Sequence, residues 1–266
     1  MTDISFSNVN DNTPVLVGNG QLTDKRGVNG YNYLEMLSEV SKKAILDCEA
    51  SINIHEHIDT VAVVRFVADT PHRDSATSNL WGYPNMPRSL SNSLNLVASN
   101  EIYTTTGGNS PQLALNELAN RIKDNQIDCA LLAGGEALDT FVGRLKEGLE
   151  ANWEDNPGGE PEVLGKSDDG TNDHEKLHGL FDPSAVYPLF ANALRSSNNQ
   201  TIREHMEDTS ELFESFSKVA SQNEFAWFPI HRSASEIAEV KPDNRMIGLP
   251  YTKYMNSIMR VNQSCA

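Results

Sequence analysis

The residues with the clearest potential for chemistry lie in the stretch YTTTGGNSPQLAL, residues 103–115. An extended run is followed there by a Gly-Gly-Asn turn at 107–109, and then by Ser110 and Pro111, which suit the start of a helix. We expect Ser110 to be the N-cap and Pro111 the first helical residue. The N-terminus of a helix favours negative charge, so such a turn can hold a phosphate or present a nucleophile.

Three interpretations of this turn compete. A nucleotide site is weakly supported, because no Walker lysine and no spaced dinucleotide glycines follow. A nucleophile elbow has the right placement but contains no cysteine, and the hydroxyl of Ser110, as an N-cap, would already bond to backbone N–H groups. The structural alternative is a glycine turn that lets the strand and the helix pack closely.

The strongest match to a metal motif is His174-Glu175-Lys176-Leu177-His178, which fits the zinc-protease pattern H-E-x-x-H. A polar run precedes the motif and Gly179 and Pro183 close it, so the helix would hold little more than the motif itself. His55 and His57 are two residues apart and do not share a helix face. We therefore predict no metal site, and a zinc hydrolase would require stoichiometric zinc.

Composition narrows the classes of partner. The chain has 21 Lys plus Arg against 37 Asp plus Glu, a formal net charge of −16, which disfavours nucleic acid and anionic membranes. No long apolar run and no basic, apolar leader is present, so we expect a cytoplasmic protein without a membrane span. Three distant cysteines, Cys48, Cys129 and Cys265, indicate reduced thiols rather than a disulfide framework.

Hydrophobic periodicity predicts an α/β fold. Alternating strands and helices imply right-handed crossovers and a mixed, mainly parallel sheet with helices on both faces and ligands at the carboxyl ends of the strands. The expected strands are residues 13–18, 58–64, 101–106 and 127–133, the last stopped by Gly134-Gly135, and the expected helices are 33–48, 88–98 and 111–123.

The predicted secondary structure of the chain changes after this α/β part. We assign residues 1–142 to the core, 143–242 to an inserted helical loop subdomain without convincing strands, and 243–266 to a return to the core sheet. Helices are expected around 184–195 and 210–223, and strand-like residues resume at 258–261.

Five segments together resemble the thiolase superfamily, in particular the thiolase-like acetyl-CoA acetyltransferases of the sterol-carrier-protein type. The resemblance extends over nearly the whole chain in the family's order. The segments are TPVLVGNGQ, IYTTTGGNSPQ, ALLAGGEA, FDPSAVYPLFANALR and NRMIGLPYTKYMNSIMRVNQSCA.

The resemblance implies a fold of two similar halves, with a loop domain inserted in the first, and transfer of acyl groups between coenzyme A and a cysteine in a Cys-x-Ser-Gly setting. It places Gly108 at the position of the cysteine, Ser110 at the serine and Pro111 at the glycine. The nucleophile is therefore absent. What the resemblance implies is an acyl-CoA acyltransferase that acts on or binds acyl-CoA, or alternatively a non-catalytic acyl-CoA-binding or partner-docking protein.

Further expectations come with the resemblance. Asn109 and nearby N–H groups would form an oxyanion site, while Asn256 and Ser257 match a segment near coenzyme A, which is a substrate rather than a resident cofactor. Cys265 matches a small residue of the family, not its second catalytic cysteine. A homodimer would form through Glu101–Thr106, and a separate subunit is a further expected partner. The family continues beyond NQSCA, so we expect the chain to be an N-terminal half with an exposed apolar face.

Overall fold

The structure is a computed structural model that describes residues 10–49, 52–69, 81–151, 153–166, 171–180, 183–256 and 260–266. The chain divides into two compact units. Unit 1 comprises Met1–Ser167 and Arg260–Ala266, and unit 2 comprises Asp168–Met259. Among the described helices, none is long and apolar enough to cross a membrane.

Unit 1 is built on a six-stranded sheet with the order β1-β10-β5-β2-β4-β7. The strands β2, β4, β5 and β7 are parallel, and β10 lies antiparallel between β5 and β1. The mixed, mainly parallel sheet predicted from the sequence is confirmed. Its strands are β1 (Gln21–Thr23), β2 (Thr60–Val63), β4 (Asn100–Thr104), β5 (Ala130–Ala137), β7 (Glu162–Leu164) and β10 (Asn262–Cys265).

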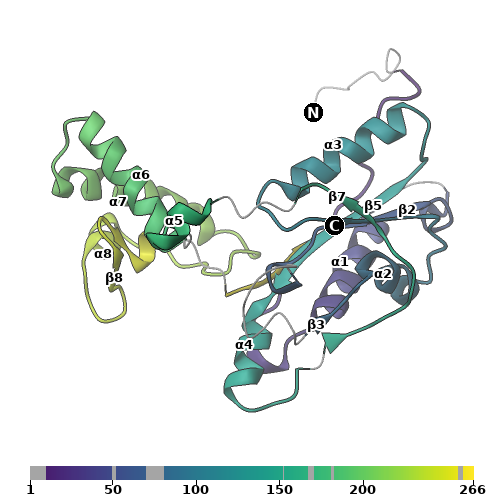
Figure 1. The fold of residues 1–266 in the computed structure, drawn as a ribbon, viewed down its shortest axis with the longest axis horizontal. Helices are drawn as coiled ribbons and strands as arrows, with labels where there is room; N and C mark the ends of the chain where they lie inside the picture. The colour runs from purple at the N-terminus through teal and green to yellow at the C-terminus, as the bar shows by residue number, and fades with distance from the viewer. Residues whose placement is uncertain are drawn as a thin grey trace. The chain divides into compact units, whose positions relative to one another are not determined.

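Helices cover both faces of this sheet. The helices α1 (Tyr33–Asp47), α2 (Met86–Leu94) and α4 (Leu138–Lys146) contribute to the larger buried core, and α3 (Ser110–Lys123) packs on the opposite face (Figure 1). A capping box between Asn32 and Glu35 starts α1. Its buried side then meets β5, which agrees with the helix predicted at 33–48.

Strand β5 runs through the two glycines that were expected to stop it. It continues to Ala137, and Gly135 pairs directly with Ser264 of β10. A Cβ atom on Gly135 would lie 2.5 Å from the Cβ of Ser264, so only glycine allows this close approach. The prediction of a strand end was wrong because these glycines serve strand pairing instead of a turn.

The strand predicted at residues 13–18 is also displaced. The first strand is β1, at Gln21–Thr23, while Val15, Leu16 and Val17 form no strand and are 63%, 85% and 51% exposed. Gly18 lies so close to α1 that a Cβ atom would approach the carbonyl oxygen of Ala44 to 2.3 Å. Residues with a strand pattern therefore pass along α1 without a partner strand among the described residues.

Unit 2 is mainly helical, as predicted for the insertion. Its helices are α5 (Asp173–Leu177), α6 (Pro183–Ser197), α7 (Ile202–Ala220) and α8 (Ala234–Ala238), and a hairpin joins β8 (Met246–Gly248) to β9 (Tyr251–Thr252), which η4 (Lys253–Met255) follows. The boundaries differ from those predicted, because α4, β6 (Trp153–Glu154) and β7 belong to unit 1. Conversely β8, β9 and η4, predicted to lie in the return to the core sheet, belong to unit 2, and the chain rejoins unit 1 only at Arg260. Strand β6 pairs with β3 (Trp81–Gly82).

Strand β4, the segment expected to pair two copies of the chain, is not at the edge of the sheet. It lies between β2 and β7, with Tyr103 of β4 opposite Val163 of β7. Because β7 occupies the free side of β4, pairing of two copies through this strand would require β7 to leave.

A buried asparagine ties β10 to the rest of unit 1. The Oδ1 atom of Asn262 accepts hydrogen bonds from the backbone N–H groups of Asp139, at 2.9 Å, and Thr140, at 3.1 Å. Its Nδ2 atom donates to Thr140 Oγ1 at 2.7 Å and to the carbonyl oxygen of Asp24 at 3.2 Å. One amide thus holds the start of α4 and the chain after β1 against β10.

We expect Asn262→Ala to lower the free energy of unfolding by about 3 kcal/mol, because buried polar groups of Asp24, Asp139 and Thr140 lose their partner. Urea denaturation measures this loss. Gln112→Ala is the matched control, since it removes an exposed amide that bonds to Asn116 on the surface of α3, and it should cost less than about 0.5 kcal/mol. Equal losses of unfolding free energy in the two variants would contradict the role of Asn262 as the amide that satisfies these buried groups.

Candidate functional site

The turn before α3 is closed by a hydrogen bond from a serine side chain. The Oγ atom of Ser110 donates to the carbonyl oxygen of Thr105 at 2.7 Å, and Ser110 N donates to Gly107 O at 3.1 Å. Ser110 is the first residue of α3 and is 2% exposed, while Asn109 is the N-cap. The predicted N-cap was wrong by one residue. The Ser110 hydroxyl does make a hydrogen bond, as predicted, but its partner is a carbonyl oxygen and not a backbone N–H group.

Gly108 lies in the open at this turn. A Cβ atom built on it meets nothing within 4 Å, and its φ is not in the left-handed region. Neither packing nor backbone conformation therefore requires glycine at 108, in contrast to the close-packing explanation considered for the turn. Asn109 is exposed beside it and makes no capping hydrogen bond with its side chain.

A cluster of polar side chains, which the sequence did not reveal, lies at the carboxyl ends of β2 and β4. Arg65 donates through Nη1 to Asp69 Oδ2 at 2.8 Å, and its guanidinium lies 3.7 Å from the centre of the Tyr103 ring. Tyr103 donates its hydroxyl to Asp69 Oδ2 at 2.6 Å. Arg65 also donates from Nε to the carbonyl oxygen of Thr104 at 3.1 Å, directly before the turn.

Burial raises the pKa of the Asp69 carboxyl above its ordinary value of 3.8, even though the Tyr103 hydroxyl and the Arg65 guanidinium act in the opposite direction. Burial likewise raises the pKa of Tyr103 well above 10, and the negative charge of Asp69 adds to this shift. Tyr103 therefore stays protonated and serves as a donor. The sequence feature that could have indicated this polar cluster is Arg65, which directly follows the β-branched run that forms β2, at the ligand end of a parallel strand.

A polar cleft of about 490 Å³ also lies in unit 1. Arg26 is held there by Asp24 at 2.8 Å and stacks on Tyr31, with 3.9 Å between its guanidinium and the ring centre. Arg144 donates to the carbonyl oxygens of Glu150 and Val28. The residues that line the cleft are Arg26, Asn29, Gly30, Tyr31, Asn32, Glu35, Arg144 and Trp153.

Contacts between buried residues connect the cleft with the polar cluster. Tyr33, next to the Asn32 that lines the cleft, donates its hydroxyl to the carbonyl oxygen of Val64 at 2.9 Å. The ring of Tyr33 lies 3.9 Å from that of Phe66, centre to centre. Since Val64 and Phe66 flank Arg65 at the end of β2, the cleft and the turn both belong to the ligand end of the parallel strands.

The remaining predicted site residues lie elsewhere. Asn256 follows η4 in unit 2, and Ser257 is outside the described residues. None of the three cysteines lies in the turn. Burial raises the pKa of Cys129, which makes this thiol a poor nucleophile.

The H-E-x-x-H match forms a helix hardly longer than the motif, as expected. In α5 the rings of His174 and His178 are 4.8 Å apart, centre to centre. Among the described residues, no group of three or more His, Cys, Asp or Glu side chains is arranged to hold a metal ion.

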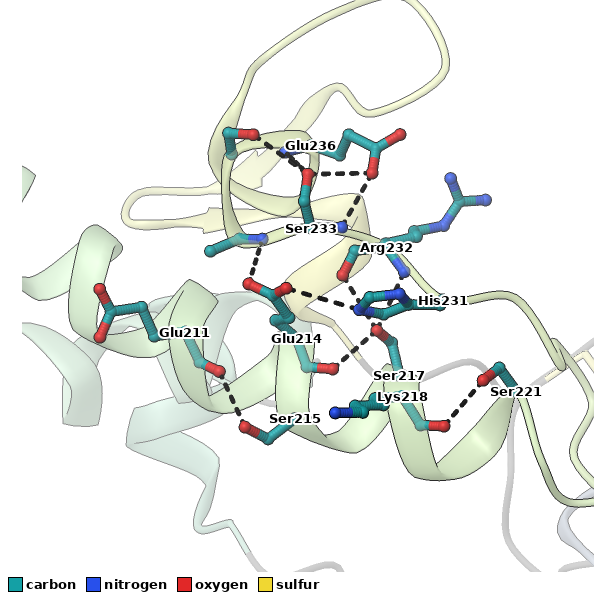
Figure 2. Close-up of polar contacts among 12 residues, drawn as sticks. Glu211, Glu214, Ser215, Ser217, Lys218, Ser221, His231, Arg232, Ser233 and Glu236 are labelled. Atoms are coloured by element: carbon teal, nitrogen blue, oxygen red, sulfur yellow. Dashed lines mark hydrogen bonds and ion pairs between the residues drawn. The ribbon is translucent and has the colours of Figure 1, made fainter.

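A serine, a histidine and a glutamate also meet in unit 2 (Figure 2). His231 Nε2 lies 3.4 Å from Glu214 Oε1, but Ser217 Oγ bonds to the backbone: it lies 2.9 Å from Glu214 O and accepts from Arg232 N at 3.0 Å. The other carboxylate oxygen of Glu214 accepts from Ala234 N at 2.9 Å. This network fastens the segment before α8 to α7, and its serine hydroxyl is not poised for catalysis.

The strand order, the helices on both faces and the turn before α3 define a thiolase-like α/β fold. The chain is similar to a monomeric SCP2-thiolase like protein type 1 from Mycobacterium smegmatis, whose crystal structure matches with a TM-score of 0.72 and 28% sequence identity. The match covers 97% of this chain, and the resemblance to the thiolase-like proteins of the sterol-carrier-protein type is confirmed at the level of the fold.

The chain spans 45% of the length of that structure. No protein-family model matches the chain, and no curated protein matches it.

The buried Asp69 makes stability depend on pH. A carboxyl with a raised folded-state pKa stabilises the fold below its unfolded-state pKa, and that contribution is lost as the pH rises through the folded-state value. We expect the free energy of unfolding of the natural chain, relative to Asp69→Asn, to fall as the pH rises from 3.8. Tyr103→Phe removes a bond that favours the carboxylate, so the fall should extend to higher pH. Urea denaturation from pH 3 to 7 measures the unfolding free energies of the natural chain and of the variants. A difference between the natural chain and Asp69→Asn that does not change with pH would contradict a raised pKa of Asp69 in the folded state.

We expect Gly108→Cys to fold like the natural chain and to present a reactive thiol, because the position is open and the start of α3 favours a thiolate. Alkylation by iodoacetamide, followed by peptide mass spectrometry as a function of pH, should give a pKa below about 8.5 for this thiol. Asn116→Cys, in the exposed middle of the same helix, is the control and should titrate near that value. A thiol at 108 that reacts no faster than the control would rule out an activating turn.

Proposed function

We propose that this chain binds the thioester of an acyl-coenzyme A at the turn before α3 and forms no acyl-enzyme there. The thiolase-like fold supports the choice of ligand. The observation that carries the proposal is Gly108, an open position without a side chain at the N-terminus of a 14-residue helix. The turn keeps the donors and dipole that suit a thioester carbonyl but lacks a group that could attack it.

In the part of the chain that the structure describes, no side chain beside the turn replaces the missing nucleophile. The Ser110 hydroxyl is buried and donates to Thr105 O, so it would have to break this bond before it could face a ligand. Among the described residues, no histidine contacts the turn, so none of them supplies the base that activates a serine. The chemistry that remains is non-covalent binding.

We place the phosphate groups of the coenzyme in the cleft at the same end of the sheet. The charge of Arg26 is already balanced by Asp24, whereas Arg144 donates to two backbone carbonyls, which carry no net charge. Arg144 therefore supplies the positive charge that a phosphate would meet. Tyr31 and Trp153 add aromatic surface to the same cleft.

A second candidate function is direct acyl transfer without a covalent intermediate. The exposed side chain of Asn109, which makes no capping hydrogen bond, favours it, because an amide N–H beside a helix N-terminus can stabilise an oxyanion. It predicts release of free coenzyme A when an acceptor is supplied, whereas simple binding does not.

The test incubates the 266-residue chain with radiolabelled acetyl-CoA. We expect saturable binding in equilibrium dialysis, no acid-stable label on the protein and no release of coenzyme A thiol. Arg144→Ala should weaken binding about tenfold, because a charge-assisted hydrogen bond is lost. Lys146→Ala, which removes an exposed cation from the same helix, should change it less than twofold.

The possible outcomes separate the proposals. No binding at millimolar acetyl-CoA contradicts the function, and acid-stable label on the natural chain contradicts the non-covalent assignment. Binding that Arg144→Ala leaves unchanged refutes only the placement of the phosphates. Thiol release without label in a parallel incubation that also contains an acyl acceptor favours direct transfer.

A further inference from the structure

Two of the three cysteines lie at the end of a helix and at the start of a strand that pack together. Cys48 is the C-cap of α1, and Cys129 directly precedes β5. Helix α1 packs against β5, and Ile45 and Cys129 both pack against the larger core on that side of the sheet. The fold therefore brings two thiols that are far apart in the sequence to the same face of the sheet.

Both thiols border one small cavity. The cavity has a volume of about 50 Å³, and its lining includes Cys48 and Cys129 together with Ala44 and Ile45 near the end of α1. A negative charge on Cys48 raises the pKa of Cys129, an effect that requires the two side chains to lie near each other. Both cysteines are half-buried, and no disulfide joins them in the structure. They are thus two separate thiols within reach of a common reagent.

Hydrogen bonds hold the chain in place at both cysteines. The carbonyl oxygen of Cys129 accepts a hydrogen bond from Asp59 N at 3.1 Å, beside the start of β2. Asp47, the last residue of α1, accepts hydrogen bonds through Oδ2 from Asn19 N at 2.9 Å and from Asn19 Nδ2 at 2.7 Å. The fold, rather than a chance encounter of loose segments, therefore keeps the two thiols close.

We propose that Cys48 and Cys129 are a redox-sensitive pair that hydrogen peroxide converts reversibly into a disulfide. The Cys48 sulfur attacks one peroxide oxygen, the O–O bond breaks, and water leaves with the thiol proton, so that Cys48 becomes a sulfenic acid. The Cys129 sulfur then attacks the Cys48 sulfur, the S–O bond breaks, and a second water leaves with the Cys129 proton. The two thiols have lost two electrons and two protons, and the peroxide has been reduced to two waters.

The surroundings of the two thiols assign their order of reaction. Burial raises the pKa of Cys129, and the negative charges of Asp59 and Cys48 add to this shift, so Cys129 stays protonated and reacts slowly with peroxide on its own. Cys48 therefore takes the first oxidation. Cys129 needs no free reactivity for the second step, because the fold holds it beside the sulfur that it attacks. A disulfide formed in this way is open to reduction by an added dithiol.

The test treats the whole 266-residue chain with hydrogen peroxide, removes the excess with catalase, and alkylates the remaining thiols with iodoacetamide in urea. Trypsin then places the two cysteines on different peptides, residues 44–65 and 124–144. We expect mass spectrometry to find these peptides joined, the peptide of Cys265 alkylated, and the link lost with dithiothreitol. Cys265→Ser is the matched control and should form the same link at the same rate.

Two further measurements test the roles and the part played by the fold. In dimedone labelling, we expect Cys129→Ser to trap about tenfold more sulfenic acid at Cys48 than Cys48→Ser traps at Cys129. In glutathione redox buffers, we expect the effective concentration of the two thiols for each other to be at least about tenfold higher in the folded chain than in urea.

Three results would overturn the proposal. Oxidation of the thiols one by one, without joined peptides, would show that the pair does not close. An effective concentration that is no higher in the folded chain than in urea would show that the fold does not bring the two thiols together. More sulfenic acid at Cys129 than at Cys48 would overturn the assigned order of attack.

Discussion

The buried amide of Asn262 is the contact on which the geometry of unit 1 depends. It joins β10 to the start of α4 and to the carbonyl oxygen of Asp24, although Asp24 and Asn262 are 238 residues apart. Asp24 in turn shapes the cleft: burial opposes its ionisation, but hydrogen bonds from Arg26 and from Tyr31 N outweigh that effect and lower its pKa below 3.8. Asn262 therefore links β10, from the far end of the chain, to the residue whose carboxylate holds Arg26 in the polar cleft.

The turn before α3 depends on a different set of contacts, none of which involves residue 108. Ser110 Oγ holds Thr105 O, and Arg65 holds Thr104 O while it pairs with Asp69. These bonds fix the end of β4 and the start of α3 whatever side chain stands at the tip. The shape of a nucleophile turn can therefore persist without its nucleophile, which is why binding and covalent catalysis are separate questions in this fold.

The periodic parts of the fold were predictable from sequence, and the long-range parts were not. Helix α1 and strands β2 and β4 follow from local pattern, because their burial repeats with the period of the element. The path of β5 through Gly134 and Gly135 could not be predicted, since it depends on Ser264, more than a hundred residues away. For the site, the placement of the turn was predictable. The Arg65, Asp69 and Tyr103 cluster was not, because it forms only when the ends of two strands meet.

The displaced first strand shows what a sequence pattern records. Val15, Leu16 and Val17 have the composition of a buried strand, and the structure gives them an ordered path along α1 but no partner in the sheet. A β-branched apolar run reflects the environment in which its side chains are stable, namely a strand with neighbours on its sides and a covered face. The mismatch between pattern and exposure therefore does not indicate a failed strand. Of these two requirements, the described structure supplies the close packing of Gly18 against α1, and it places no strand beside the three apolar residues.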